Sequence, residues 1–317
     1  MRPDAARWFA RRTWRAVDAP SWSSLLALKG GQSISVVVPA LDEAPTVGAV
    51  VAAAHRLVLA GLVDEVLVVD GGSADGTSDL AAAAGARVVA RQNVLPGYGD
   101  RPGKGESLWK ALDATDGDLL VYLDADVTGA SPAWIAGLLW PLLAEPAVSF
   151  VKACYDRPLA LLGGQVAPTG GGRVTELTAR PLIDLLWPEL AGVVQPLAGE
   201  YAGRRSLLES LPYSSGYAVE LGLLLDAHQE VGLDGLAQVD LGVRRHRNRG
   251  TSDLGRMSAA ILAEALARAG TAMPGGTLTQ FVREGVEFAP QDSPVGGPAR
   301  PPMLAIHEYA VRRARAS

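Results

Sequence analysis

The sequence predicts an α/β fold in which a mostly parallel sheet carries helices on both faces. Short apolar runs of strand length alternate with longer runs of helical spacing through the first half of the chain. Such alternation is typical of a parallel sheet, because parallel strands need crossover helices to connect them. With 317 residues, of which 48% are hydrophobic and 20% charged, the chain can bury a large core.

The first half of the chain contains strands that alternate with helices. The first strand is expected to stop at Pro39, which lacks a backbone N–H. Apolar residues at helical spacing, a terminal glycine or an N-cap such as Asp75 mark the helices. We expect strands at residues 33–38, 64–70, 86–90 and 118–124. We expect helices at residues 46–61, 75–85 and 103–115.

The organisation changes after Val127. A Ser-Pro pair begins the next helix, and a glycine-rich segment at 163–173 leads into another. From Pro290 the tail is rich in proline, and we expect it to wrap the surface or a partner subunit. We expect helices at residues 131–144, 174–187, 216–232 and 253–270, and strands at residues 148–155 and 235–246.

Composition and charge exclude several classes of protein. The net charge of −5 argues against general affinity for nucleic acid. The most apolar run, at 134–144, is too short for a bilayer and contains Pro141, so we expect no stable membrane insertion. The basic first residues are followed by no apolar region and cleavage site of a secretory signal. The lone cysteine, Cys154, fits a reducing compartment, and we expect a cytoplasmic protein.

Two carboxylates, Asp124 and Asp126, directly follow a buried strand in "DLLVYLDAD". Ligands of open α/β sheets bind beyond the carboxyl ends of the strands, so we expect these aspartates to line one crevice with "PALDE" and "DGGSADGT", which end two other strands. Like charges so close together raise each other's pKa unless a cation or donor lies between them. Mg²⁺ prefers carboxylate oxygens and completes its shell with water and phosphate oxygens. The pattern therefore predicts a metal-bound diphosphate.

Other polar groups leave two interpretations open. Asp70 and Asp75 suit either ligand contact or the capping of the helix that follows. The arginines of "RRHRNR" at 244–249 suit either a small anion or a solvated surface. The sequence "GGGR" at 170–173 opens a helix, so its free N–H groups and guanidinium suit a phosphate, whereas the glycines alone suit a flexible loop.

Longer motifs carry a resemblance to known enzymes. The segments "VVVPALDE", "VVDGGSADGT", "GKGESLWKAL" and "VYLDAD" resemble the nucleotide-sugar-binding half of glycosyltransferases with the A-type fold, in which a D-x-D motif holds a metal on the donor diphosphate. The segments "TGGGRVTELTARPL", "PLAGEYAGRRSLL", "GYAVELGLLLD" and "LGVRRHRNR" resemble, more narrowly, the glucosyl-3-phosphoglycerate synthases and the closely similar mannosyl-3-phosphoglycerate synthases. The similarity runs from about Ser33 to Gly270.

The resemblance implies a role for each matching residue. Asp126 and His246 are the implied metal ligands, and Asp126, Glu220, Lys104 and Arg244 are the implied catalytic residues. Lys104 is implied to contact the donor near its sugar and diphosphate, and Glu220 to hold the sugar hydroxyls. The implied donor-binding residues are Pro39, Ala40, Leu41, Glu43, Gly71, Lys104, Asp124, Ala125, Tyr217, Glu220, Arg244 and Arg249. The implied acceptor-binding residues are Gly172, Arg173, Thr175 and Asn248.

Two positions depart from the family pattern. Gly71 stands where the family often has serine, so only backbone contact with the uridine is implied there. Ala125 replaces a serine in the middle of the D-x-D motif, which matters little if the backbone makes the contact.

The implied reaction is transfer of glucose from UDP-glucose to the 2-hydroxyl of 3-phospho-D-glycerate, with retention of configuration. The implied cofactor is Mg²⁺, with Mn²⁺ or Co²⁺ as substitutes, and the implied assembly is a homodimer. The alternatives are a mannosyl-3-phosphoglycerate synthase that uses GDP-mannose and, less similar, a polyprenyl-phosphate sugar synthase. A nucleotidyltransferase fits less well because its glycine-rich loop would follow the first strand, and a nucleotide-sugar sensor leaves the second anion site unexplained.

On this basis we divide the chain into four parts. We expect an N-terminal extension at residues 1–32 and a nucleotide-sugar-binding half at residues 33–127. We expect an acceptor-binding half at residues 128–270 and a C-terminal tail at residues 271–317.

Overall fold

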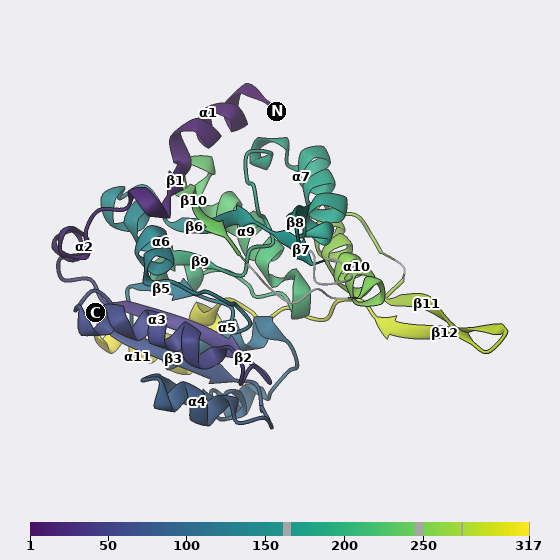
Figure 1. Ribbon diagram of the computed structural model, residues 1–317, viewed down its shortest axis with the longest axis horizontal. Coiled ribbons are helices and arrows are strands. Elements are labelled where there is room, and N and C mark those ends of the chain that lie inside the picture. Colours follow the sequence, from purple (N-terminus) through teal and green to yellow (C-terminus); the bar gives the residue numbers. More distant parts are fainter. Residues whose placement is uncertain (161–165, 245–249, 274, 317) are drawn as a thin grey trace.

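The computed structural model describes residues 1–160, 166–244, 250–273 and 275–316, and its centre is one eight-stranded sheet (Figure 1). The strands lie in the order β1 (Thr13–Arg15), β10 (Leu236–Val243), β6 (Phe150–Asp156), β9 (Tyr201–Arg204), β5 (Leu119–Tyr122), β2 (Ile34–Ala40), β3 (Glu65–Asp70) and β4 (Arg87–Ala90). β9 runs antiparallel to both of its neighbours, and the other pairings in this sheet are parallel. The mostly parallel α/β class expected from the sequence is therefore confirmed.

Helices cover both faces of the sheet, and each face has its own core. Successive strand residues point to opposite faces, so Val36 and Val38 of β2 join one core and Val37 joins the other. One face is covered by α3 (Val47–Leu59), α4 (Thr77–Ala83) and α6 (Pro132–Ala144), and the other by α5 (Lys104–Ala114), α9 (Val219–Val231) and α10 (Thr251–Arg268).

The N-terminal residues pack against one edge of the sheet. α1 (Pro3–Arg12) leads into β1, which pairs with β10 and which the sequence pattern does not reveal. Trp8 Nε1 donates a hydrogen bond of 3.0 Å to the carbonyl of Leu236, and α2 (Trp22–Lys29) then connects β1 to β2. The N-terminal residues therefore add a strand to the main sheet.

Several elements differ from the expectation. β2 does not stop at Pro39 but continues to Ala40, because its pairing with β5 ends at Val37 and leaves only β3 beside the proline. β9 lies in a segment where we expected no strand. β7 (Pro158–Ala160) and β8 (Val166–Gly170) form a small separate sheet. The helix expected at 174–187 is present, but it includes a π-helical turn, Thr175–Ala179, which continues directly into α7 (Arg180–Leu186).

The C-terminal part leaves the body of the protein and returns to it. β11 (Thr277–Glu284) and β12 (Glu287–Pro294) form an antiparallel hairpin that projects away from the main sheet (Figure 1). The chain then passes along α5 and ends in α11 (His307–Ala316), which packs on the same side of the sheet as α5. No helix within the described residues is both long enough and apolar enough to cross a membrane.

Candidate active site

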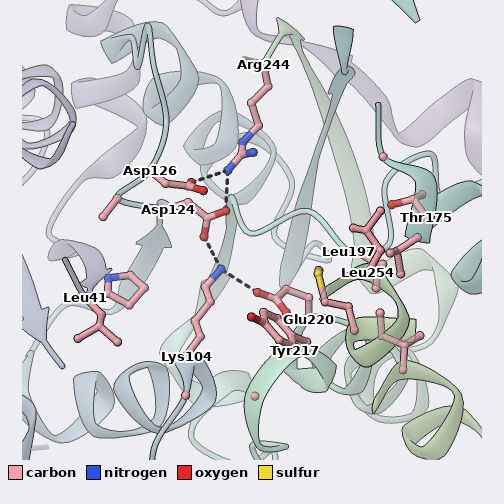
Figure 2. A pocket seen from close by; sticks show the side chains of 18 of the residues that line it. Leu41, Lys104, Asp124, Asp126, Thr175, Leu197, Tyr217, Glu220, Arg244 and Leu254 are labelled. Carbon is pink, nitrogen blue, oxygen red and sulfur yellow. Dashed lines mark hydrogen bonds and ion pairs between the residues drawn. The ribbon is translucent and has the colours of Figure 1, made fainter. Parts of the chain in front are cut away.

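A cavity of about 360 Å³ lies at the carboxyl ends of β2, β5, β6 and β10 (Figure 2). The segments that follow these strands contribute Leu41, Asp124, Arg157 and Arg244 to its wall. α5, α9 and α10 supply further lining residues from one face of the sheet. The cavity therefore occupies the position at which open α/β sheets bind their ligands.

The structure brings most of the predicted site residues together in this cavity. Its lining includes members of both the donor and the acceptor set, namely Pro39, Ala40, Leu41, Glu43, Lys104, Asp124, Ala125, Asp126, Gly172, Arg173, Thr175, Tyr217, Glu220 and Arg244. Gly71 lies just behind the wall, where its N–H donates a 2.8 Å hydrogen bond to the carbonyl of Ala40. His246, Asn248 and Arg249 lie outside the described residues.

Charged side chains form a continuous chain across the cavity (Figure 2). Lys104 pairs with Asp124, and its Nζ lies 2.7 Å from Glu220 Oε1. Arg244 Nη2 lies 2.7 Å from Asp124 Oδ2 and 3.2 Å from Asp126 Oδ1. The Arg244 guanidinium thus lies within contact of both aspartates.

These contacts shift the pKa values of the groups involved. Burial raises the pKa of Asp124, but the charges of Lys104 and Arg244 outweigh burial and hold that pKa well below its usual range. Burial lowers the pKa of Lys104, whereas Asp124 and Glu220 raise it, and the net effect is a raised pKa. Asp124 is therefore ionised and Lys104 protonated at neutral pH.

Glu200 fixes the orientation of Arg244, and Tyr155 in turn holds Glu200. Arg244 Nε donates a 2.7 Å hydrogen bond to Glu200 Oε1, and the Tyr155 hydroxyl donates one of 2.8 Å to Glu200 Oε2. The Glu200 side chain is completely buried and that of Arg244 almost so. A buried carboxylate with charge-assisted bonds to a guanidinium fixes the orientation of the planar group. Glu200 therefore sets how Arg244 faces the two aspartates.

A close approach of the backbone gives Asp124 its position in this network. Gly199 precedes Glu200, and a Cβ atom at Gly199 would collide with both carboxylate oxygens of Asp124. Any larger residue at position 199 would force Asp124 to move. Asp124 cannot move easily, because Lys104 and Arg244 already hold its carboxylate. The segment that carries Glu200 thus also shapes the site of Asp124.

The far end of the cavity, around Thr175, offers a site for an anion. Thr175 is buried, and its Oγ1 has no hydrogen-bond partner within the described part of the chain. Arg157 lines the same region, and its buried Nε also lacks a hydrogen-bond partner among those residues. Gly172 adopts a left-handed φ of +72°, just before the π-helical turn. Buried polar groups without partners cost free energy, so with Arg173 beside them they suit a phosphate or carboxylate ligand.

Asp70 and Asp75 accept hydrogen bonds from nearby loop backbone, and neither is the N-cap of α4, which is Gly76. Asp70 accepts a 3.2 Å hydrogen bond from the N–H of Ser73. Asp75 accepts hydrogen bonds from the N–H of Thr77 at 3.1 Å and of Ala44 at 3.0 Å. These two aspartates therefore shape the loop beside the cavity and do not line it.

The carboxylates of Asp124 and Asp126 are of the kind that could form part of a metal site. Asp126 leaves 31% of its side chain exposed, so its carboxylate can be reached from the cavity. Within the described residues, no group of three or more His, Cys, Asp or Glu side chains is placed to hold a metal ion. Carboxylates at this position suit a hard cation whose other ligands come from a bound diphosphate or from the predicted ligand His246.

Sequence reasoning missed several residues of this site, among them Arg157 and Glu200. The rule that ligands bind beyond strand ends could have found Arg157, because "YDRP" follows the expected strand at 148–155 as "DAD" follows the strand at 118–124. Glu200 lies in the motif "PLAGEYAG", but no local pattern distinguishes a buried glutamate from an exposed one. Its role depends on a partner 44 residues away in the chain.

Comparison with known proteins agrees with this geometry. Residues 35–164 match the family model "Glycosyl transferase family 2". Over 302 residues the chain is 49% identical to the glucosyl-3-phosphoglycerate synthase of Mycolicibacterium smegmatis, covering 95% of this chain and 98% of that protein. The chain belongs to the glucosyl-3-phosphoglycerate synthase family.

Solved structures of glucosyl-3-phosphoglycerate synthases have the same fold. The chain matches the enzyme from Mycobacterium tuberculosis in complex with Mn²⁺, UDP-glucose and phosphoglyceric acid with a TM-score of 0.85 and 45% identity, covering 93% of this chain and 99% of that chain. The complex of the same enzyme with Mg²⁺ and UDP gives a TM-score of 0.85 and 45% identity over the same shares of the two chains. The resemblance and the fold class predicted from the sequence are therefore confirmed.

Proposed function

We propose that this chain is a metal-dependent glycosyltransferase that moves glucose from UDP-glucose to the 2-hydroxyl of 3-phosphoglycerate. One observation carries the proposal: the charged chain of Lys104, Asp124 and Arg244 shares a single cavity with the anion site around Thr175. The first suits a metal-bound diphosphate, and the second suits a phosphorylated acceptor. A family member that is 45% identical and bound to UDP-glucose and phosphoglyceric acid supports both assignments.

The donor lies along the carboxyl ends of β2 and β5. Pro39, Ala40 and Leu41 surround the uracil and ribose, with Glu43 beside them. Leu41 is 53% exposed, and stacking a base against it removes apolar surface from water. Gly71 contributes its backbone alone. These residues belong to the proposed nucleotide-sugar-binding half, residues 33–127.

Asp126 and His246 are the proposed metal ligands, with Asp124 on the same strand end. When bound, Mg²⁺, Mn²⁺ or Co²⁺ offsets the negative charge of the departing diphosphate. Arg244, held in place by Glu200, adds a fixed positive charge beside the same oxygens, and Arg249 is proposed to act with it.

Lys104, Glu220 and Tyr217 hold the glucose. Glu220 accepts hydrogen bonds from the sugar hydroxyls, and Lys104, 2.7 Å from Glu220, donates toward the sugar and the diphosphate. The bond between the anomeric carbon and the phosphate oxygen breaks, and the 2-hydroxyl oxygen of the acceptor attacks the same face of that carbon. Because attack comes from the face that the phosphate leaves, the configuration is retained. The leaving phosphate oxygen takes the proton of that hydroxyl. Glu220 and Asp124 both pair with cations, which makes either carboxylate a weak nucleophile.

The acceptor phosphate lies at the opposite end of the cavity. The Thr175 hydroxyl, the Arg173 guanidinium and the backbone at Gly172 bind it, and Asn248 is proposed to complete the site. Arg157 adds a second guanidinium to this site. Its positive charge also helps to lower the pKa of Asp124. A phosphomonoester carries close to two negative charges at neutral pH and suits these donors. Residues 128–270 are the proposed acceptor-binding half.

We further propose a homodimer that forms through the hairpin of β11 and β12. Phe281 and Phe288 are 65% and 62% exposed, and the cross-strand pairs Phe281 with Pro290 and Arg283 with Phe288 place these side chains on one face. A two-stranded hairpin is marginal on its own in water, and a second subunit would cover these apolar rings. A cytoplasmic location is part of the proposal, because both substrates are anions that cross a bilayer only at high cost.

The proposal is tested by incubating the purified chain with UDP-glucose, 3-phosphoglycerate and Mn²⁺ and following UDP release together with the mass of the product. We expect UDP release that requires both the metal and 3-phosphoglycerate, and a product heavier than 3-phosphoglycerate by one hexose residue. UDP release that is independent of 3-phosphoglycerate would contradict the proposed function.

A further inference from the structure

Residues 297–301, which we call the strap, contact α5 and the segment at 213–216 and do not line the cavity. The strap follows the β11–β12 hairpin and precedes α11. It belongs to the C-terminal tail, a part of the chain to which the proposed reaction assigns no role. Its central residue, Arg300, is a buried arginine, only 6% exposed.

Arg300 holds the start of α5. Its Nε and Nη2 each lie 2.7 Å from an oxygen of Glu106, which is 3% exposed, so the two side chains form a buried two-pronged ion pair. Arg300 Nη1 also donates a 2.9 Å hydrogen bond to the carbonyl of Tyr98, in the loop that leads into α5. One turn further along α5, Trp109 Nε1 donates to the carbonyl of Pro301 at 2.8 Å. Glu106 is two residues from Lys104, the first residue of the helix.

The strap also holds the segment that leads to Tyr217 and Glu220. The N–H of Tyr213 donates to the carbonyl of Arg300 at 3.0 Å, and the N–H of Arg300 donates back to the carbonyl of Tyr213 at 2.8 Å. Gly297 packs against Ser215, since a Cβ atom at Gly297 would lie 2.9 Å from the Ser215 hydroxyl oxygen. The strap is therefore fixed to both walls that carry the residues proposed to hold the sugar.

The two walls meet with little free space between them. A Cβ atom at Gly103 would lie 3.1 Å from Gly216 Cα, and one at Gly105 would overlap the carbonyl of Ser214. On the cavity side the walls are joined by the ion pair between Lys104 and Glu220 (Figure 2). Away from the cavity lining they are joined by the strap. The strap and the ion pair therefore link the same two walls.

A second set of contacts runs from Glu106 to the cavity. Lys110, one turn along α5, lies 3.5 Å from Glu106 and 3.2 Å from Asp100. Asp100 accepts hydrogen bonds of 2.8 and 2.9 Å from Arg91, which lines the cavity. The pKa of Asp100 is lowered chiefly by its hydrogen bond to Arg91, which keeps it ionised at neutral pH. Glu106 thus pairs with Arg300 and also with Lys110, whose contact with Asp100 leads on to Arg91 at the cavity.

We infer that Arg300 is a positioning residue for the transfer reaction, which sets the geometry of Lys104 and Glu220 around the transferred sugar by tying α5 to the segment at 213–216. This inference rests on the proposed function, because it assigns the sugar to Lys104 and Glu220. A purely structural ion pair would affect stability alone. Substitution of a positioning residue must also change the ratio of the affinities for UDP-glucose and for UDP, because UDP lacks the sugar.

The test uses Arg300→Lys in the full chain. Lysine keeps one charged contact with Glu106 but cannot reach both Glu106 oxygens and the Tyr98 carbonyl at once. The variant is therefore expected to fold with a weaker link between the strap and α5. Binding of UDP-glucose and of UDP is measured by calorimetry in the presence of Mn²⁺, together with kcat and the KM of each substrate. We expect UDP-glucose to bind about tenfold more weakly, as for loss of one charged hydrogen bond, with UDP binding within about twofold of wild type. The KM for 3-phosphoglycerate should stay close to that of wild type.

Arg312→Ala is the matched control. Arg312 of α11 pairs with Asp113 at the other end of α5, with 2.5 Å between Arg312 Nη2 and Asp113 Oδ1, so this variant also breaks an arginine–carboxylate pair between the C-terminal part and α5. It should leave the ratio of UDP-glucose affinity to UDP affinity unchanged.

A double variant tests whether Arg300 acts through the contact of Lys104 with Glu220. In the Glu220→Gln background, where that contact is already weakened, Arg300→Lys should change UDP-glucose binding by less than about twofold, because both substitutions act on the same interaction.

Three results would overturn the inference. One is a lower melting temperature for Arg300→Lys with an unchanged ratio of UDP-glucose to UDP affinity. Another is an equal loss of affinity for both nucleotides, and the third is full additivity of Arg300→Lys with Glu220→Gln. A wild-type protein that binds UDP-glucose but transfers no glucose would instead contradict the proposed function, so the two failures are distinguishable.

Discussion

Arg244 and Glu200 form an ion pair beneath the cavity, with 2.7 Å between Arg244 Nε and Glu200 Oε1 and with almost no exposure of either side chain. The same guanidinium reaches Asp124 and Asp126 through Nη2. A side chain that touches no ligand in the proposed complex thus determines where a positive charge lies beside the diphosphate. The arrangement makes Glu200 a positioning residue for Arg244.

The first prediction concerns Glu200→Gln. The amide keeps the shape of the side chain but loses the charge that orients Arg244, so one charged hydrogen bond, worth about 1.5–3 kcal/mol, is weakened. We expect kcat/KM for UDP-glucose to fall about tenfold or more in initial-rate measurements. Glu145→Gln is the control, because Glu145 pairs with Arg12 away from the cavity. A Glu200→Gln variant that is less stable yet retains wild-type kcat/KM would show that the pair serves stability alone.

The second prediction concerns the metal. Asp126→Asn should abolish most activity and remove Mn²⁺ binding in the presence of UDP, since an amide oxygen is a poorer ligand for a hard cation than a carboxylate. His246→Ala should have the same effect if it is the second ligand. Binding is followed by calorimetry, with Asp156→Asn, an exposed carboxylate at the end of β6, as the control. Full turnover by Asp126→Asn in chelator-treated buffer would disprove this assignment.

The third prediction concerns the acceptor phosphate. Thr175→Val preserves the shape of a buried side chain but removes the hydroxyl that lacks a partner among the described residues. We expect the KM for 3-phosphoglycerate to rise about tenfold, with a larger rise for Arg173→Ala, and UDP-glucose binding to stay unchanged. Glycerate without the phosphate should be a very poor acceptor.

The control for the acceptor site is Thr178→Val. Thr178 lies on the same π-helical turn as Thr175, but its hydroxyl pairs with Ser258 at 2.9 Å and does not line the cavity. This variant should retain the wild-type KM for 3-phosphoglycerate. Equal weakening of donor and acceptor binding by Thr175→Val, or efficient use of glycerate by the wild type, would mean that the acceptor site is misplaced.

The fourth prediction concerns Lys152, a buried lysine whose Nζ donates a 2.6 Å hydrogen bond to the carbonyl of Ala198. Burial lowers its pKa from 10.5 to about 8, although the charges of Glu220 and Glu200 act in the opposite direction. Between these two pKa values the unfolded chain binds a proton that the folded chain does not, so the free energy of unfolding rises with pH through this range. Below about pH 8 both states are protonated and the cost of burying the charge is fully present.

Comparison with Lys152→Met isolates this effect. Methionine fills a similar volume but carries no proton, so the stability of the wild type relative to the variant should increase by about 2 kcal/mol between pH 7 and pH 9.5. Urea unfolding at the two pH values measures the change. A difference between wild type and variant that does not vary with pH would show that Lys152 titrates normally.

The sequence predicted the parts of the fold that local patterns encode. Apolar runs located the central strands, and the rule that ligands bind beyond strand ends placed Asp124 and Asp126 in the cavity. The same reasoning could not find β1 or the hairpin of β11 and β12. β1 has only three residues and pairs with a strand more than 200 residues later, and the hairpin is largely polar and exposed.

The resemblance to a family located site residues that periodicity could not. Glu220 and Thr175 have no local feature that separates them from other helical residues, yet both line the cavity. Glu200 and Arg300 escaped both approaches, because each is defined by a partner that only the folded chain brings near. A buried charge is recognised by its pairing, and the pairs Glu200–Arg244 and Glu106–Arg300 span 44 and 194 residues of the chain.

The most direct test of glucose transfer to 3-phosphoglycerate is a competition between donors. The purified protein is given equal concentrations of UDP-glucose and GDP-mannose with 3-phosphoglycerate and Mg²⁺, and the product is identified by NMR, which reports both the sugar and the configuration of its anomeric carbon. We predict that most of the product is glucosyl-3-phosphoglycerate, with the sugar on the 2-hydroxyl and in the anomeric configuration of the donor. A mannosylated product, or a glucosylated product of inverted configuration, would contradict this account.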